Sequence, residues 1–215
     1  MNTNLSIRLA DACVENNVEK LIVFSTCAVY SDKQNSAYSE TGIASPNSPY
    51  GISKLNATKK IISLLKHSGT SYYILRPNLV YGKNGKENYK TLVNLIYKLS
   101  ISPFCRATQK RSYVSVHNLC DFILHLSKHN VASGIYNVSD NHDLSTSELC
   151  ELIAKAKNKK IIQLPVPKWL IKTAFQMIGK KDHYEKIYGE FRLNIDKALA
   201  TGWKPSPVNY RNFEL

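Results

Sequence analysis

Tyr50 and Lys54 are the residues of this sequence whose types and spacing most clearly allow chemistry. If residues 50–65 form a helix, four residues correspond to about 400° of rotation, so the two side chains lie on one face, one turn apart. A lysine ammonium beside a phenol favours the phenolate and lowers the pKa of the phenol from its ordinary value of about 10. The pair therefore predicts a general base that can accept a proton from a hydroxyl group near neutral pH.

The spacing alone is weak evidence, because a chain with 13 tyrosines and 23 lysines is expected to hold one such pair by chance. An ordinary Tyr–Lys contact on a surface helix is therefore the alternative interpretation. The context favours catalysis. The apolar run Leu21–Phe24 and the hydroxyl residues Ser25 and Thr26 precede the pair and are separated from it by a long polar loop. Long polar loops between regular elements often carry functional sites.

Short apolar runs alternate with helical patterns along the chain, and this order predicts an α/β fold with a parallel sheet. The runs Leu21–Phe24 and Tyr72–Arg76 are continuously apolar or nearly so, as expected of strands buried on both faces of a sheet. Further strands are expected at 111–116, where polar and apolar residues alternate, and at 134–138. Helices are expected at about 4–16, 50–66, 87–99, 119–128 and 145–157.

Composition bounds the kind of protein. The 215 residues are 43% hydrophobic, which is enough for a folded domain with its own core. The formal net charge is +13, but 23 of the 29 cationic residues are lysines scattered along the chain. Without an arginine-rich arm or a recognition motif, this charge indicates solvated faces and a preference for an anionic ligand, and it does not favour nucleic acid.

Other compositional features exclude several classes of site. The five cysteines are widely spaced and never occur as Cys-x-x-Cys, which favours reduced thiols in a cytoplasm over a disulfide framework or a zinc site. The six histidines form no His-Glu-x-x-His motif, so no metal site is expected. No apolar run approaches 18 residues, so no transmembrane segment is expected.

Taken together, these stretches resemble the extended short-chain dehydrogenase/reductase family, in particular its sugar-nucleotide 4-epimerases and 4-ketoreductases. The matching stretches are Phe24–Tyr30, Tyr50–Lys54, Arg76–Gly82, Arg111–Leu119 and Gly202–Pro205. The resemblance implies a partial Rossmann-type parallel sheet that lacks its first strands, with a small C-terminal α/β substrate-binding subdomain. Residues 1–80 would be the remaining C-terminal half of the Rossmann domain. Residues 81–215 would bind the nucleotide-sugar, interleaved with returning Rossmann elements at about 111–140.

The resemblance also implies catalytic roles. Tyr50 matches the family's catalytic base, and Lys54 matches its partner, which would also hold the nicotinamide ribose of NAD. Thr26 matches the family's Ser/Thr that hydrogen-bonds the reacting sugar oxygen. The 4,6-dehydratases of the family place an Asp-Glu pair directly after this threonine. Here the two positions are Cys27 and Ala28, and this argues against dehydration because neither side chain can shuttle the proton.

Further residues match binding positions of the family. Ser25, Pro77 and Leu79 lie where the family contacts the nicotinamide side of the cofactor. Asn88 and Arg111 match positions that hold the nucleotide diphosphate of a UDP-sugar or a related nucleotide-sugar, and an arginine fork suits a diphosphate. The alternative interpretations are that Asn88 is a helix cap and Arg111 a surface strand residue.

One element of the family is missing from the sequence. Its fold begins with a strand and a glycine-rich turn, where a helix N-terminus binds the cofactor pyrophosphate. The nine glycines of this chain form no Gly-x-x-Gly-x-x-Gly, so the pyrophosphate site of NAD is largely absent. We expect the missing N-terminal half to be supplied by another chain, or the protein to be a truncated product; the alternative partner is a second copy in a homodimer. The retained sheet would then keep an unpaired, apolar edge.

Several functions stay open at this point. The first is an NAD-dependent epimerase of the UDP-glucose or UDP-N-acetylglucosamine 4-epimerase type, serving polysaccharide biosynthesis; the second is a nucleotide-sugar 4-ketoreductase. A different class is an inactive remnant or a sugar-nucleotide-binding module. The basic amphipathic segment 165–183, which contains Trp169, is more typical of a helix that completes a small domain's core. Such a helix can also lie at a membrane interface and meet a lipid-linked sugar.

Overall fold

The computed structural model describes residues 2–30, 36–82, 93–94, 96, 98, 100–177, 179 and 181–209. The chain forms two compact units, and each is considered by itself. Unit 1 comprises Met1–Asn78, Asn118–Ser139 and Leu193–Pro205, and unit 2 comprises Leu79–His117, Asp140–Arg192 and Ser206–Leu215.

Unit 1 is built on a three-stranded sheet in the order β1-β2-β6, and both pairs of neighbours are parallel. Its strands are β1 (Lys20–Phe24), β2 (Ser71–Pro77) and β6 (Gly134–Val138). Phe24 lies opposite Leu75, and Pro77 lies opposite Val138. Since the strands are parallel, their carboxyl ends share one edge of the sheet, which is where open α/β sheets bind ligands.

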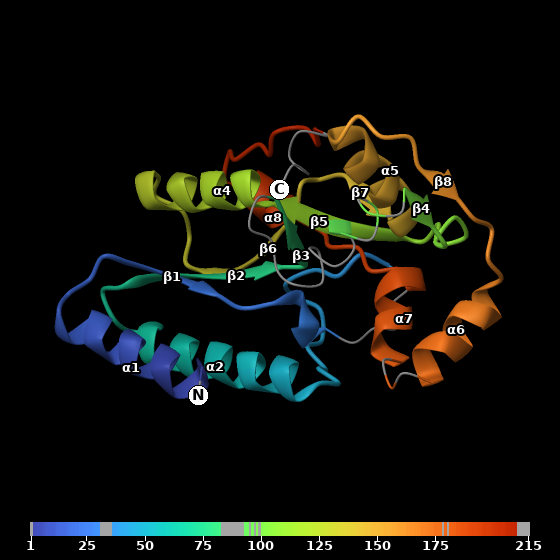
Figure 1. The fold of residues 1–215 in the computed structure, drawn as a ribbon. Helices are drawn as coiled ribbons and strands as arrows, with labels where there is room; N and C mark the ends of the chain where they lie inside the picture. The colour runs from blue at the N-terminus through green and yellow to red at the C-terminus, as the bar shows by residue number, and fades with distance from the viewer. Residues whose placement is uncertain are drawn as a thin grey trace. The chain divides into compact units, whose positions relative to one another are not determined.

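Helices cover both faces of this sheet. Figure 1 shows α1 (Asn2–Glu15) and α2 (Pro49–Leu65) side by side on one face and α4 (Val116–Lys128) on the other. The first face is closed by apolar side chains of α1, β1, α2 and β2, with Ile61 and Ile74 fully buried. On the other face, Phe122 packs edge-on against Tyr136, with ring centroids 5.9 Å apart. Two short helices, η1 (Cys27–Val29) and α8 (Asp196–Leu199), complete the unit.

Unit 2 contains a second sheet in the order β3-β5-β7, in which β3 and β5 are parallel and β5 and β7 antiparallel. A separate parallel pair is formed by β4 and β8. The strands are β3 (Leu79–Tyr81), β4 (Ile101–Ser102), β5 (Lys110–Ser115), β7 (Asp143–Ser145) and β8 (Ile162–Gln163). The helices are α5 (Thr146–Ala156), α6 (Lys168–Met177) and α7 (Lys181–Tyr188). The apolar core of the unit centres on Tyr81, Tyr113 and Cys150.

The α/β fold and its parallel sheet confirm the fold predicted from sequence. The strands β1, β2 and β6 lie within one residue of the predicted ranges. The strands β3, β4, β7 and β8 were not predicted, because two or three residues are too few to show a period. The helix predicted from about 87 to 99 lies largely outside the described residues, although 93, 94, 96 and 98 are helical.

Cys150 in the core of unit 2 leads to a prediction on alkaline stability. Burial raises the pKa of its thiol from 9.0 to about 11. The folded state therefore keeps a proton that the unfolded chain loses above pH 9.0, so stability is present below that pH and is lost as the pH rises toward 11. We expect urea titrations to show a loss of about 2–3 kcal/mol from this group over that range. Cys150→Ala should have a shallower decline, and an unchanged decline would contradict the assignment.

Candidate active site

The candidate site of unit 1 begins where β1 ends. Ser25 continues the strand ladder by one residue, because its N–H donates to the Leu75 carbonyl at 2.8 Å. Thr26 then caps η1, and its Oγ1 accepts the N–H of Ala28 at 3.2 Å. Ser25 is buried and Thr26 is half-buried. The hydroxyl of Thr26 is thus held in place directly beyond the carboxyl end of β1.

Helix α2 presents Tyr50, Lys54 and Thr58 as one stripe, because positions four apart lie on the same face. The Nζ of Lys54 donates to the carbonyl of Phe24, the last residue of β1, at 3.0 Å. One turn further, the Oγ1 of Thr58 lies 3.3 Å from the Oγ of Ser25. The stripe therefore faces the end of β1. Tyr50 is one turn nearer the helix start on the same stripe, and its side chain is 46% exposed.

The start of α2 is well defined by its sequence. Ser48 is the N-cap and accepts the N–H of Gly51 at 3.1 Å, and Pro49 occupies the first turn, where a missing N–H costs nothing. This fixes the turn that carries Tyr50.

Gly51 brings this turn into direct contact with η1. A Cβ at Gly51 would lie 2.3 Å from the Ala28 carbonyl oxygen and 2.8 Å from the Cβ of Pro46. Only a residue without a side chain permits this approach. Since η1 follows Thr26 and Gly51 follows Tyr50, the contact sets the spacing between the two proposed catalytic residues. The sequence analysis missed Gly51 and Thr58, although a small residue beside Tyr50 and a further polar residue at the same spacing were visible signals.

A buried polar network anchors the other end of η1. Arg76 on β2 is only 2% exposed, and its Nη1 donates to the hydroxyl of Tyr30 at 2.9 Å. Tyr30 in turn donates to Oδ1 of Asn137 at 2.8 Å. Burial raises the pKa of the Tyr30 phenol, and the Arg76 guanidinium only partly offsets this, so Tyr30 stays a neutral donor. A second contact that fixes η1 is the hydrogen bond from Cys27 Sγ to Asn78 Oδ1, at 3.1 Å.

The remaining predicted residues are placed as follows. Pro77 is the last residue of β2 and is buried at the same carboxyl edge as Phe24. Leu79 is the first residue of β3 and packs against the core of unit 2. Asn88 lies outside the described residues. The structure thus brings Ser25, Lys54 and Pro77 to one edge within unit 1.

Arg111 lies on β5 of unit 2 and is half-buried. Its Nη1 donates to the carbonyl of Gly189 at 2.7 Å and to that of Glu185 at 3.3 Å, at the end of α7. Its guanidinium lies 5.4 Å from the ring centroid of Phe191. Arg111 therefore has a structural role in holding α7, and its role in diphosphate binding stays a prediction.

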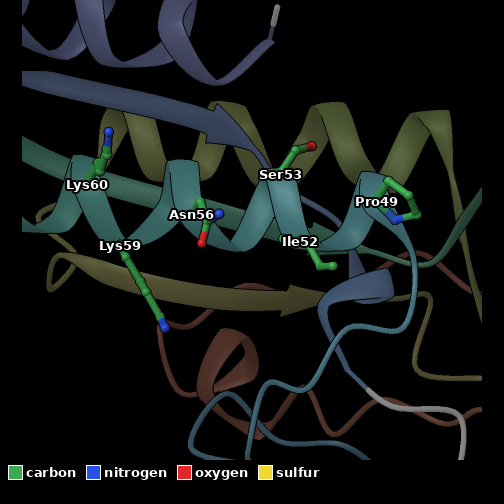
Figure 2. A pocket seen from close by; sticks show the side chains of 6 residues that line it. All are labelled: Pro49, Ile52, Ser53, Asn56, Lys59 and Lys60. Carbon is green, nitrogen blue, oxygen red and sulfur yellow. The ribbon is translucent and has the colours of Figure 1, made fainter.

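A hollow on α2 lies away from this chemistry. Figure 2 shows its lining side chains following one another along α2: Pro49, Ile52, Ser53, Asn56, Lys59 and Lys60. Ile52 and Lys59 are about half a turn around the helix from Tyr50. The hollow is therefore on the outer face of α2, and we do not assign it to the active site.

Neither a metal centre nor a membrane-spanning helix is found in the part of the chain that the structure describes. No group of three His, Cys, Asp or Glu side chains there is placed to hold a metal ion. No helix there is long and apolar enough to cross a membrane.

Comparison with known proteins places this geometry in context. The chain is 33% identical to a UDP-glucose 4-epimerase of Vibrio cholerae, over 100% of this chain and 67% of the relative. It is 29% identical to the N-acetyl-alpha-D-glucosaminyl-diphospho-ditrans,octacis-undecaprenol 4-epimerase of Escherichia coli O157:H7, over 88% of this chain and 58% of that protein. The chain thus spans about two thirds or less of the length of these relatives.

Solved structures share the fold. The UDP-N-acetylglucosamine 4-epimerase of Bacillus cereus matches 99% of this chain and 67% of its own, with a TM-score of 0.75 and 21% identity. The dTDP-4-dehydrorhamnose reductase of Bacillus anthracis, solved with NADP, matches 99% and 69%, with a TM-score of 0.76 and 21% identity. A sequence profile of the NAD dependent epimerase/dehydratase family matches residues 1–139. The profile covers more than half of the chain, so the chain belongs to the NAD dependent epimerase/dehydratase family.

Proposed function

We propose that this chain is part of an NAD-dependent nucleotide-sugar 4-epimerase that acts on UDP-glucose or UDP-N-acetylglucosamine. In this proposal the chain binds the nicotinamide half of NAD and the sugar of the substrate. The observation that carries the proposal is the bond between Lys54 Nζ and the Phe24 carbonyl. It holds the lysine of a Tyr–Lys pair at the carboxyl edge of a parallel sheet, beside Ser25 and Thr26. The V. cholerae relative, a UDP-glucose 4-epimerase, supports the choice of reaction.

The residues have complementary roles in this proposal. Tyr50 takes the proton of the sugar 4-hydroxyl and returns it after the configuration at that carbon has changed. Lys54 supplies a positive charge one helical turn from Tyr50 on the same face of α2. The Thr26 hydroxyl donates to the reacting sugar oxygen. Its oxygen already accepts the N–H of Ala28, so its O–H is directed away from that backbone group.

The edge of unit 1 fits the nicotinamide half of NAD better than the pyrophosphate half. Lys54, whose ammonium is fixed by its bond to the Phe24 carbonyl, would hold the nicotinamide ribose. Ser25 and Pro77 flank the same edge. When bound, NAD supplies a reversible acceptor for the hydride of the reacting carbon. The 215-residue sequence contains no glycine-rich fingerprint to hold the pyrophosphate.

We therefore propose that a further polypeptide segment, the missing N-terminal half, holds the pyrophosphate half of NAD. A homodimer partner is a separate proposal, because a second copy of the same sequence has no glycine-rich fingerprint either. Among the described strands, β1 pairs only with β2, so its other edge can receive a parallel strand. A cytoplasmic location is supported by the five cysteines, which all lie within the described residues and form no disulfide. We propose no nucleic-acid partner, because the lysines are scattered.

A 4-ketoreductase is the second candidate, and the structural likeness to a dTDP-4-dehydrorhamnose reductase keeps it open. Dehydration is disfavoured, because Cys27 bonds to Asn78 at 3.1 Å and Ala28 has no group that can transfer a proton. A lipid-linked diphospho-sugar is a second candidate substrate class. The name of the E. coli relative suggests it, and the exposed face of α6 described below favours it.

The isolated chain is expected to bind NAD poorly, because the pyrophosphate contributes much of the binding energy and its glycine-rich cradle is missing from the sequence. Calorimetric titration of the purified chain with NAD checks this, and tight binding would contradict it. Conversion of UDP-glucose to UDP-galactose, followed by NMR after adding NAD and the separately produced N-terminal half of the V. cholerae relative, tests the epimerase itself. A chain that binds UDP-sugar but never converts it under these conditions would be a binding module.

A further inference from the structure

Helix α6 in unit 2 has one face against the unit and an apolar face in solvent. On the inner side, Ile171 contacts the core, while Lys168 and Lys172, although exposed, lie over the rings of Tyr188 and Tyr184, at 5.8 and 6.0 Å from the ring centroids. On the outer side, Trp169 is 66% exposed and Met177 is 87% exposed. A surface helix that only completes a core keeps its large apolar side chains on the inner side.

The outer face is continuous along the helix. At 100° per residue, its members fall within an arc of about 140°. These members are Trp169, Leu170, Thr173, Ala174 and Met177, and all are exposed. The helix contains no buried residue at all. The exposed face is therefore an apolar stripe with one hydroxyl.

Large apolar side chains are also exposed in and beside the strand that precedes α6. Ile162 on β8 is 62% exposed, and it pairs with Ile101 on β4, which is 38% exposed. Leu164, between β8 and α6, is 41% exposed. Unit 2 thus exposes several large apolar side chains within one stretch of chain. Exposed apolar surface of this kind marks an interaction site.

The charge of the same stretch identifies the kind of partner. Residues 152–181 contain eight lysines and neither aspartate nor glutamate. An apolar stripe with tryptophan, in a stretch of sequence whose only charged residues are lysines, matches the interfacial region of a bilayer with anionic headgroups. Ten residues of helix are too short to span a bilayer, so α6 would lie in the plane of the surface.

We propose that the outer face of α6, together with Ile162 and Leu164, docks unit 2 onto an anionic lipid surface. A second copy would bring the lysines of one chain against those of the other. A protein partner would bury the stripe without lipid, and the chain would then not float with any vesicle. The proposal does not depend on the proposed enzymatic function, because its test measures no turnover.

The test is flotation of the full chain with vesicles of phosphatidylcholine alone and of phosphatidylcholine with phosphatidylglycerol, at low and at high salt. We expect flotation with the anionic vesicles and its loss at high salt. The double variant Trp169→Ser/Met177→Ser should reduce partitioning by on the order of tenfold. The control is Ile43→Ser, because Ile43 in unit 1 is as exposed as Met177, at 87%.

A second pair of variants tests the charge. Lys159→Gln/Lys160→Gln should weaken binding by about fivefold for each lysine removed, since a lysine near an anionic surface contributes about 1 kcal/mol. Lys59→Gln/Lys60→Gln removes the same charge from the exposed face of α2 and should have less effect. Equal losses in both pairs would show that only net charge matters and would overturn the docking assignment.

Tryptophan fluorescence gives an independent readout, because Trp169 is exposed and Trp203 is only 3% exposed. Anionic vesicles should shift the emission to the blue in the wild-type chain and not in Trp169→Phe. The absence of flotation with any vesicle would overturn the proposal. So would a chain dimer that the Trp169→Ser/Met177→Ser variant dissociates in the absence of lipid, since the stripe would then serve self-association.

Discussion

Tyr50→Phe is expected to lower turnover of the UDP-sugar by about 10²–10⁴-fold, the usual contribution of a positioned general base. The change removes only the phenol oxygen and keeps the ring, so α2 and its contacts with β1 should persist. The bond from Lys54 to Phe24 does not involve Tyr50 and should hold the lysine in place. Binding of the UDP-sugar should therefore change little while the rate falls.

The measurement is conversion of UDP-glucose by the chain supplied with NAD and a cofactor-binding half, with UDP-sugar affinity from calorimetry. The matched control is Tyr72→Phe, because Tyr72 on β2 is a partly buried tyrosine that packs against the core of unit 1. A Tyr50→Phe protein with unimpaired turnover would remove Tyr50 from the catalytic assignment. An equal loss in Tyr72→Phe would point to a general effect on folding.

Gly51→Ala is expected to damage both stability and activity, against the trend of helix propensity. Alanine in place of glycine within a helix normally stabilises by about 1 kcal/mol. Here the new Cβ would lie 2.3 Å from the Ala28 carbonyl oxygen, so either η1 or the first turn of α2 must move. Overpacking of this kind costs about 1–3 kcal/mol. A shift of about 1 Å between Thr26 and Tyr50 would lower turnover by on the order of 10²-fold.

Gly69→Ala provides the control, because a Cβ at Gly69 meets no atom within 4 Å. Thermal unfolding and turnover of the two variants should diverge, with Gly69→Ala close to wild type. The informative result is a Gly51→Ala protein that keeps most of its stability and loses turnover, since only positioning explains that combination. A Gly51→Ala chain that is more stable and fully active would refute the close approach.

The Tyr–Lys pair shows which features of the fold can be predicted from residues close together in the sequence. The spacing of four residues places Tyr50 and Lys54 on one face of the helix, whatever the position of the helix in the fold. The start of α2 follows from the N-cap residue Ser48 and from Pro49. The apolar runs that became β1 and β2 were equally visible, since buried parallel strands are continuously apolar. Which strands pair with each other could not be predicted from the sequence, because the pairing joins residues about 50 positions apart, such as Phe24 and Leu75.

Arg76 and Gly51 show what local pattern cannot supply. The sequence marks Arg76 only as a cation at the end of an apolar strand, yet it is buried against Tyr30, which is 46 residues away. Gly51 looks like a poor helix residue until Ala28 is placed against it. The 165–183 segment was expected to form one helix that completes a core, whereas the structure has α6 and the start of α7 there. Ile171 does contact the core, but the face with Trp169 and Met177 is exposed, because burial depends on the neighbours that the fold provides.

The sequence by itself determined the alternation of strands and helices, the shared helix face of Tyr50 and Lys54 and the charge of the chain, because these depend on composition or on neighbours within a few positions. Tertiary structure alone decided that Lys54 meets the end of β1, that Gly51 and Ala28 are in contact, and that the apolar stripe of α6 faces solvent. Each of these depends on contacts between segments that are distant in sequence, and no local period encodes such contacts.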